Sequence, residues 1–188
     1  AVVASFESNP ATQASQCSKD ELYRTLKGVA DAKYATREES IVIDKGRMWP
    51  SPQIMETMGK VLGEPVKIIA TVRPMAECIA SFYVVDKGMN IKEWVKTSQL
   101  MQHLMQSYQA LKAGYEKNPK NFCLIEYDNL CDNPQGELDR IADFLNVGRY
   151  TYNPHIDQVA EDDNAWNIDG LHTLGSTIEK TGQDTKQI

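Results

Sequence analysis

The sequence predicts a three-layer α/β/α domain with a mainly parallel central sheet. Two observations support this expectation. Segments rich in β-branched residues alternate along the chain with longer segments whose apolar residues recur at helical spacing. The strongest strand pattern, Val66–Val72, is almost continuously apolar, which is typical of a parallel strand covered on both faces. With 188 residues, 41% hydrophobic and 24% charged, the chain has the size and composition of one globular domain.

The first half of the chain carries two helix signals and one short strand signal. The S-x-x-E capping-box pattern at Ser18–Glu21 predicts a helix from residue 19 to about residue 34. The Ser-Pro pair at 51–52 predicts the start of a second helix, which we expect to close near Gly63. Between these helices, Ile41–Ile43 is a short β-branched run that we expect to be a strand.

The second half of the chain predicts two strands and three helices. In chain order these are a strand at Val66–Val72, helices at Met75–Val84 and from Ile91 to about Glu116, a strand at Phe122–Tyr127 and a helix that opens at Asn133-Pro134. Methionines and aromatic residues recur every three or four positions in the longest helix, which favours a face packed on the sheet over a substrate-lining stripe. Residues 150–188 are polar, and we expect them to form a C-terminal extension or a lid.

Composition and charge exclude several classes of function. The net charge of -6 argues against a general nucleic-acid binder, which needs a basic surface to neutralise phosphates. No apolar stretch is long enough to span a bilayer, and the N-terminal residues do not form a signal peptide, so we expect no membrane partner. The four cysteines form no CxxC pair and no metal-ligand spacing with the three histidines. We therefore expect no metal site and a reduced, cytoplasmic compartment.

The ends of the predicted strands indicate where to look for a binding site, because ligands of parallel α/β sheets bind beyond the carboxyl ends of the strands. Arg73 follows the strongest strand, and its guanidinium can bind a phosphate through two charge-assisted hydrogen bonds. Ser81 follows on the next predicted helix and can add a hydroxyl contact. In an alternative interpretation, Arg73 pairs with an acidic neighbour such as Glu77 and Ser81 only packs. Position alone favours neither.

Two blocks of the sequence resemble the sulfotransferase family. In the first, the apolar strand Val66–Val72 ends in Arg73-Pro74, and Ser81 follows the arginine by eight positions. The second block consists of Leu124-Ile125-Glu126-Tyr127-Asp128-Asn129-Leu130, then Asp132-Asn133-Pro134, Ile141 and Phe144-Leu145. It is similar to the family region written YEDL…DP…I…FLG. The blocks occur in the family's order, and the resemblance covers roughly residues 40–150.

Two shorter matches accompany these blocks. Ile43–Trp49 resembles the strand-plus-Lys element that lies upstream in several sulfotransferases. The region around Asp162-Asp163 and Gly170–His172 is similar to bacterial and phage-borne members. The resemblance implies a P-loop NTPase-like fold in which residues 1–188 form a single domain.

The resemblance also implies a reaction and a donor. Family members transfer a sulfonate group from 3′-phosphoadenosine 5′-phosphosulfate to a hydroxyl or amine of a small-molecule or glycan acceptor, and release adenosine 3′,5′-bisphosphate. Arg73 and Ser81 would bind the 3′-phosphate. Tyr127 would approach the adenine or its neighbouring loop, or alternatively serve as a core tyrosine at a strand end. Lys45 and Arg47 would stabilise charge on the transferring sulfonate, with an ordinary solvated turn as the alternative.

Two departures from the family pattern concern catalysis. Members normally begin with a strand and a Gly-rich turn that cradles the 5′-phosphosulfate, but residues 1–40 contain one glycine, Gly28, inside the first predicted helix. We expect the missing strand and turn to precede Ala1 in a longer gene product. Many members also carry a histidine base two residues after the lysine. Here that position is Arg47, which cannot accept a proton. Asp44 is a candidate base by proximity alone, and its position favours the alternative role of a charge partner for Lys45 or Arg47.

These departures leave two other functions open. A nucleotide kinase-like phosphotransferase would keep the fold and require a full GxxxxGK[ST] loop with Mg²⁺-dependent ATP binding. A non-catalytic descendant that binds a nucleotide without turnover is favoured by the absence of a histidine after Lys45. The acceptor and the oligomeric state are not indicated by any motif.

Overall fold

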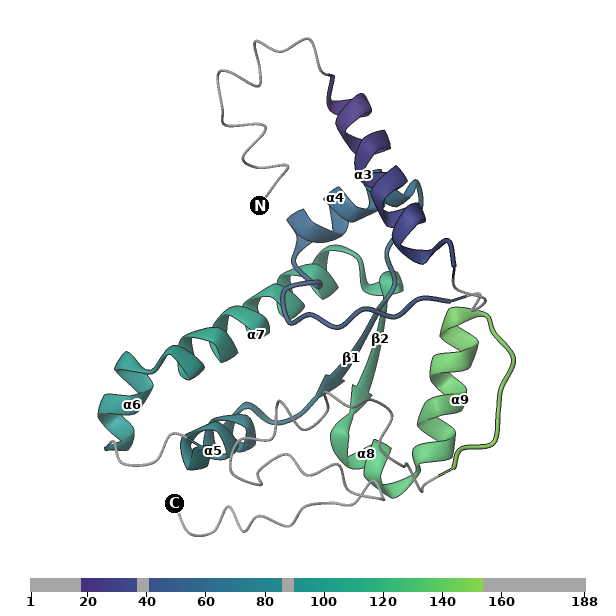
Figure 1. Ribbon diagram of the computed structural model, residues 1–188. Coiled ribbons are helices and arrows are strands. Elements are labelled where there is room, and N and C mark those ends of the chain that lie inside the picture. Colours follow the sequence, from purple (N-terminus) through teal and green to yellow (C-terminus); the bar gives the residue numbers. More distant parts are fainter. Residues whose placement is uncertain (1–17, 37–40, 86–89, 154–188) are drawn as a thin grey trace. The chain divides into compact units, whose positions relative to one another are not determined.

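The computed structural model of the chain describes residues 18–36, 41–85 and 90–153 (Figure 1). In chain order the elements are α3 (Lys19–Tyr34), α4 (Pro52–Leu62), β1 (Ile68–Val72), α5 (Met75–Val85), α6 (Ile91–Thr97), α7 (Gln99–Lys117), a 3-10 turn (Pro119–Asn121), β2 (Phe122–Glu126), α8 (Tyr127–Asp132) and α9 (Pro134–Leu145). The chain divides into two compact units: residues 1–66 with 107–121, and residues 67–106 with 122–188.

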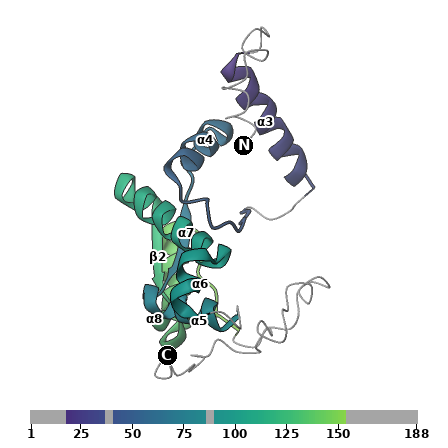
Figure 2. The same cartoon turned by 90° about the vertical axis from the view of Figure 1, so that its left-hand side faces the viewer.

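In the first unit, helices α3 and α4 lie against each other (Figures 1 and 2). The hydroxyl of Ser18 accepts a hydrogen bond from the backbone N–H of Glu21 at 3.2 Å, so the predicted cap of α3 is confirmed. Helix α4 begins after Ser51, whose hydroxyl accepts from Ile54 N–H. It ends at Gly63, which has a φ of 79°, a conformation that glycine adopts without a Cβ clash. Both predicted helices of this half are confirmed.

The strand predicted at Ile41–Ile43 is wrong. Residues 41–46 have no regular secondary structure, and the side chain of Ile43 is 75% exposed. A β-branched run prefers extended backbone, but a strand is stable only when a neighbour completes its hydrogen bonds. No strand in the described part of the chain pairs with this run. The premise that Lys45 stands at a strand end therefore fails.

The second unit is built around the parallel pair β1 and β2 (Figure 1). Ile68 is in register with Phe122, and Val72 with Glu126. Ile125 of β2 is fully buried, whereas β1 is less covered than its apolar sequence predicts, because Thr71 is exposed. The mixed helix and strand composition and the parallel pairing are confirmed. The described sheet contains two strands, so the three-layer arrangement stays a prediction.

The single long helix predicted from Ile91 to Glu116 is interrupted at Ser98. This residue is extended, its N–H donates to the carbonyl of Trp94 at 2.9 Å, and its hydroxyl accepts from Leu100 N–H at 3.2 Å. Ser98 therefore ends α6 and caps α7. The break lets the indole of Trp94 become fully buried, edge-on against Tyr83 at 5.6 Å between ring centroids.

The chain after β2 forms two helices where one was predicted. The strand ends at Glu126 rather than at Tyr127, which begins the short, unpredicted helix α8. The predicted helix α9 is confirmed: the Asn133 side chain accepts from Gly136 N–H at 3.1 Å. It ends at Asn146, which adopts the left-handed conformation with a φ of 61°.

Candidate functional site

The carboxyl ends of β1 and β2 bring Arg73 and Tyr127 together. Parallel register pairs Val72 with Glu126, so the next residue of each strand leaves the sheet at the same edge. The guanidinium carbon of Arg73 lies 4.9 Å from the centroid of the Tyr127 ring, which is the range of a cation–π contact. Two residues from the two family-like blocks thus meet at the edge where ligands of parallel sheets bind.

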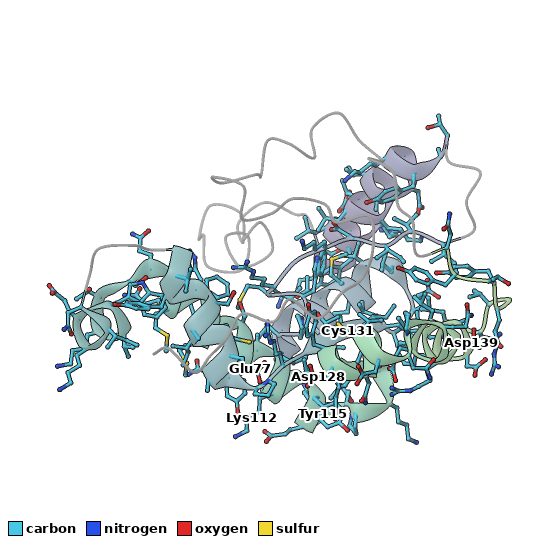
Figure 3. The ribbon with its side chains drawn as sticks, turned by 90° about the horizontal axis from the view of Figure 1, so that it is seen from below. Glu77, Lys112, Tyr115, Asp128, Cys131 and Asp139 are labelled. Carbon is cyan, nitrogen blue, oxygen red and sulfur yellow. The ribbon has the colours of Figure 1, made fainter. Side chains whose placement is uncertain are left out.

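Arg73 also forms an ion pair with Glu77. Glu77 lies in the first turn of helix α5 and is labelled in Figure 3. Its Nε donates to the Glu77 carboxylate at 2.6 Å, with the two side chains 28% and 33% exposed. This hydrogen bond raises the pKa of Arg73 above its already high value, so the guanidinium stays charged. The ion pair that the sequence left as an alternative is present. Within the described residues, the terminal nitrogens Nη1 and Nη2 of Arg73 donate no hydrogen bond to the protein.

Ser81 lies on the same helix, one turn beyond Glu77, and is half-buried. Residues four apart share one face of a helix, so Ser81 is on the face of α5 that carries the partner of Arg73. Cys78 closes the other side of this corner: its thiol lies 4.0 Å from the Arg73 carbonyl oxygen. Burial raises the pKa of the Cys78 thiol, which makes it a packing group rather than a nucleophile.

Further acidic residues lie at the end of β2 and the start of α8. Besides Glu77, Glu126 ends β2 and Asp128 lies in the first turn of α8 (Figure 3). Glu126 accepts a hydrogen bond from the Asn129 amide at 3.4 Å. An anion bound here would have to interact directly with the Arg73 guanidinium, because the surrounding carboxylates supply no positive field.

Lys45 and Arg47 lie in the first unit, in an exposed segment. The backbone N–H of Lys45 donates to its neighbour Asp44 at 2.9 Å. Gly46, between Lys45 and Arg47, packs closely against Trp49. A Cβ added at Gly46 would lie 2.5 Å from Cδ1 of that indole. The structure thus gives this glycine an internal packing role, and the residues expected at the sulfonate belong to a different unit from Arg73.

A comparison with protein families identifies the chain. The family model for the sulfotransferase domain matches residues 5–162. The chain belongs to the sulfotransferase domain family. No curated protein and no solved structure shows significant similarity to it. The match includes both family-like blocks and the Lys45 segment, so it supports the resemblance that the motifs indicated.

One cavity of the sulfotransferase chain lies within the first unit. It has a volume of about 530 Å³ and is lined by residues of α3 and the end of α4, namely Lys19, Asp20, Tyr23, Arg24, Lys27, Lys60, Val61 and Gly63. None of the predicted site residues lines it. Two of its lysines form ion pairs with carboxylates on their own helices: Lys27 with Asp31, and Lys60 with Glu56. The C-terminal carbonyls of α4 also attract cations, so the basic lining has an internal explanation.

The described part of the sulfotransferase chain offers no cluster of three or more metal-ligating side chains. None of its described helices is long and apolar enough to cross a membrane. His155 and His172 lie outside the described residues, as does the predicted extension from residue 154 onward.

Sequence reasoning missed one contact of the site. The cation–π contact of Arg73 with Tyr127 was not predicted, although the parallel order of the two blocks was available as a signal. The Arg73–Glu77 pair was considered as an alternative to ligand binding, whereas the geometry allows both at once. A guanidinium has five N–H donors, and the carboxylate uses Nε.

Proposed function

We propose that the chain is a sulfotransferase that takes its sulfonate from 3′-phosphoadenosine 5′-phosphosulfate. The observation that carries the proposal is the Arg73 guanidinium at the carboxyl end of β1. It lies 4.9 Å from the Tyr127 ring centroid, and its terminal nitrogens are uncommitted among the described residues. That geometry fits a phosphate, which accepts two parallel hydrogen bonds from an arginine. Membership of the sulfotransferase domain family supplies the reaction class.

In this proposal Arg73 and Ser81 bind the 3′-phosphate of the donor, and Tyr127 lies toward the adenosine. Lys45 and Arg47 stabilise negative charge on the sulfonate as it moves. The bond between the sulfur and the bridging oxygen breaks while the acceptor oxygen or nitrogen attacks the sulfur. The bridging oxygen keeps the electron pair in adenosine 3′,5′-bisphosphate, and the acceptor's proton leaves to a base. The acceptor is a hydroxyl or amine of a small molecule or glycan, and the cytoplasm is the proposed compartment.

Calorimetric titration with adenosine 3′,5′-bisphosphate tests the donor assignment. We expect binding by the protein and a loss of at least about tenfold in affinity for Arg73→Ala, because charge-assisted hydrogen bonds to a phosphate contribute about 1.5–3 kcal/mol. The matched control is Arg149→Ala, which removes another arginine of the second unit that pairs with the carboxylates of Asp139 and Asp143. Equal affinities for Arg73→Ala and the unchanged protein would contradict the proposal.

Two further outcomes separate the competing functions. Stabilisation by ATP with Mg²⁺, and none by the bisphosphate, would indicate a kinase-like phosphotransferase. Bisphosphate binding without transfer of radiolabelled sulfonate to any of a panel of hydroxyl and amine acceptors would favour a non-catalytic nucleotide binder. That second function has one specific observation in its favour, which is that Arg47 stands where many family members carry a histidine base.

A further inference from the structure

We propose that Glu77 is a positioning residue that fixes the guanidinium of Arg73 so that its terminal edge, Nη1 with Nη2, binds the phosphate. The inference rests on the proposed function, in which Arg73 binds the 3′-phosphate of the donor. In this inference Glu77 does not contact the phosphate, but its hydrogen bond to Nε leaves the terminal edge of Arg73 as the edge that binds it.

The structure shows two contacts of the guanidinium and leaves one of its edges for a ligand. A planar guanidinium has two kinds of edge that can bind an oxyanion with two hydrogen bonds: the side edge, which includes Nε, and the terminal edge. Glu77 occupies Nε at 2.6 Å and so takes the side edge. The centroid of the Tyr127 ring lies 4.9 Å from the guanidinium carbon, at cation–π distance. The terminal edge is the remaining surface on which two parallel hydrogen bonds to a phosphate can form.

The position of Glu77 suits this role. It lies one turn after Arg73, in the first turn of α5, where a carboxylate also interacts favourably with the helix N-terminus. Both side chains are about two-thirds covered, at 28% and 33% exposure, so the pair is more ordered than an ion pair in open solvent. An arginine that is already ordered loses less conformational entropy when it binds a ligand.

Glu77 also carries a cost, because its charge repels a phosphate bound to the same guanidinium. Two substitutions separate the positioning of Arg73 from the repulsion of the phosphate. In Glu77→Gln the amide oxygen can still accept the hydrogen bond from Nε, but the side chain has no charge. Glu77→Ala removes both the charge and the acceptor. If positioning is the larger effect, alanine weakens binding and glutamine does not. If repulsion is the larger effect, both substitutions strengthen it.

The experiment measures the affinities of adenosine 3′,5′-bisphosphate and adenosine 5′-monophosphate by calorimetry. For Glu77→Ala we expect bisphosphate affinity to fall about three- to tenfold, the range expected when one long side chain must be ordered on binding. Monophosphate affinity should stay within about twofold, because that ligand has no 3′-phosphate. Glu77→Gln should bind the bisphosphate at least as tightly as the unchanged protein. The control is Asp143→Ala, which removes the carboxylate partner of an exposed arginine in the same unit.

A double-mutant cycle completes the test. In the Arg73→Ala background, Glu77→Ala should not weaken bisphosphate binding further, because the favourable effect of the carboxylate acts through the arginine. Unchanged or tighter bisphosphate binding by Glu77→Ala would overturn the inference, as would equal losses for both ligands. If the unchanged protein does not prefer the bisphosphate to the monophosphate, the proposed function itself fails. If it does prefer the bisphosphate, and Arg73→Ala but not Glu77→Ala removes that preference, only the positioning role is wrong.

Discussion

At the scale of single residues, Arg73 makes two contacts of different origin. Its ion pair with Glu77 depends on residues close in sequence, whereas its contact with Tyr127 depends on the pairing of β1 with β2. The pair with Glu77 follows from a spacing of four residues at the start of a helix and can be read from the sequence. The stacking on Tyr127 depends on how β1 and β2 align, since a shift of register would separate the two strand ends. Local spacing therefore predicts the first contact, while the second requires the structure.

The ring of Tyr127, rather than its hydroxyl, should support phosphate binding. Tyr127→Leu removes the aromatic face under the guanidinium, and we expect bisphosphate affinity to fall about three- to tenfold, in line with a partly desolvated cation–π contact of about 0.5–1.5 kcal/mol. Tyr127→Phe keeps that face and should bind within about twofold of the unchanged protein. Calorimetry on both variants checks this expectation. A phenylalanine variant as weak as the leucine variant would assign the effect to the hydroxyl instead.

At the scale of helices and strands, the capping signals predicted where helices begin, whereas strand propensity predicted β1 and β2 correctly but failed at Ile41–Ile43. The Ser18, Ser51 and Asn133 caps work through side chain to backbone contacts within three residues, so their sequence patterns are sufficient. Ile41–Ile43 has the composition of a strand, but pairing with another segment decides whether a strand forms. The break at Ser98 was missed because the apolar spacing of α6 and α7 continues across it.

Ser98 should stabilise the junction between α6 and α7 through its hydroxyl. The side chain is buried, at 5% exposure, and accepts from Leu100 N–H at 3.2 Å. Ser98→Ala leaves that donor without its partner, so we expect the free energy of unfolding to fall by about 1–2 kcal/mol. Urea denaturation followed by circular dichroism measures the change. Gln102→Ala, an exposed position in the first turn of α7, is the control and should change stability by less than about 0.5 kcal/mol. Equal stabilities for the two variants would show that the hydroxyl does not act as a cap.

At the scale of the whole molecule, the sequence predicted the family but not the division of the chain into two units. The two motif blocks, each within a short stretch and in the family's order, were sufficient to predict the family. The alternation of strand and helix patterns predicted the parallel strand pair. The catalytic half of the proposed site was not predictable in the same way. Lys45 and Arg47 were expected beside the donor from a strand that does not form, and they belong to the other unit. Their catalytic role remains a prediction that the transfer assay tests.

The segment after α9 belongs to the packed part of the second unit, and this bears on where the chain can be shortened. It runs beside α9 (Figure 1), where the Gln135 amide donates to the Tyr150 carbonyl at 2.9 Å and its oxygen accepts from Tyr152 N–H at 2.7 Å. Arg149 pairs with Asp143 on the same helix. These contacts tie residues 147–152 to α9, so truncation after Asn146 would remove them and expose the face of α9 that they cover.

We therefore expect two truncations to differ. A chain ending at Asn146 loses the two hydrogen bonds that Gln135 forms with Tyr150 and Tyr152, so its free energy of unfolding should be lower by about 1–3 kcal/mol. A chain ending at Asp162, where the family match ends, keeps them and should retain the stability and bisphosphate affinity of the full chain, because the Arg73 contacts come from residues 73–127. Urea denaturation and calorimetry on the same samples give both quantities. Faster release of the bisphosphate by the chain ending at Asp162 would indicate instead that residues 163–188 act as a lid over the donor.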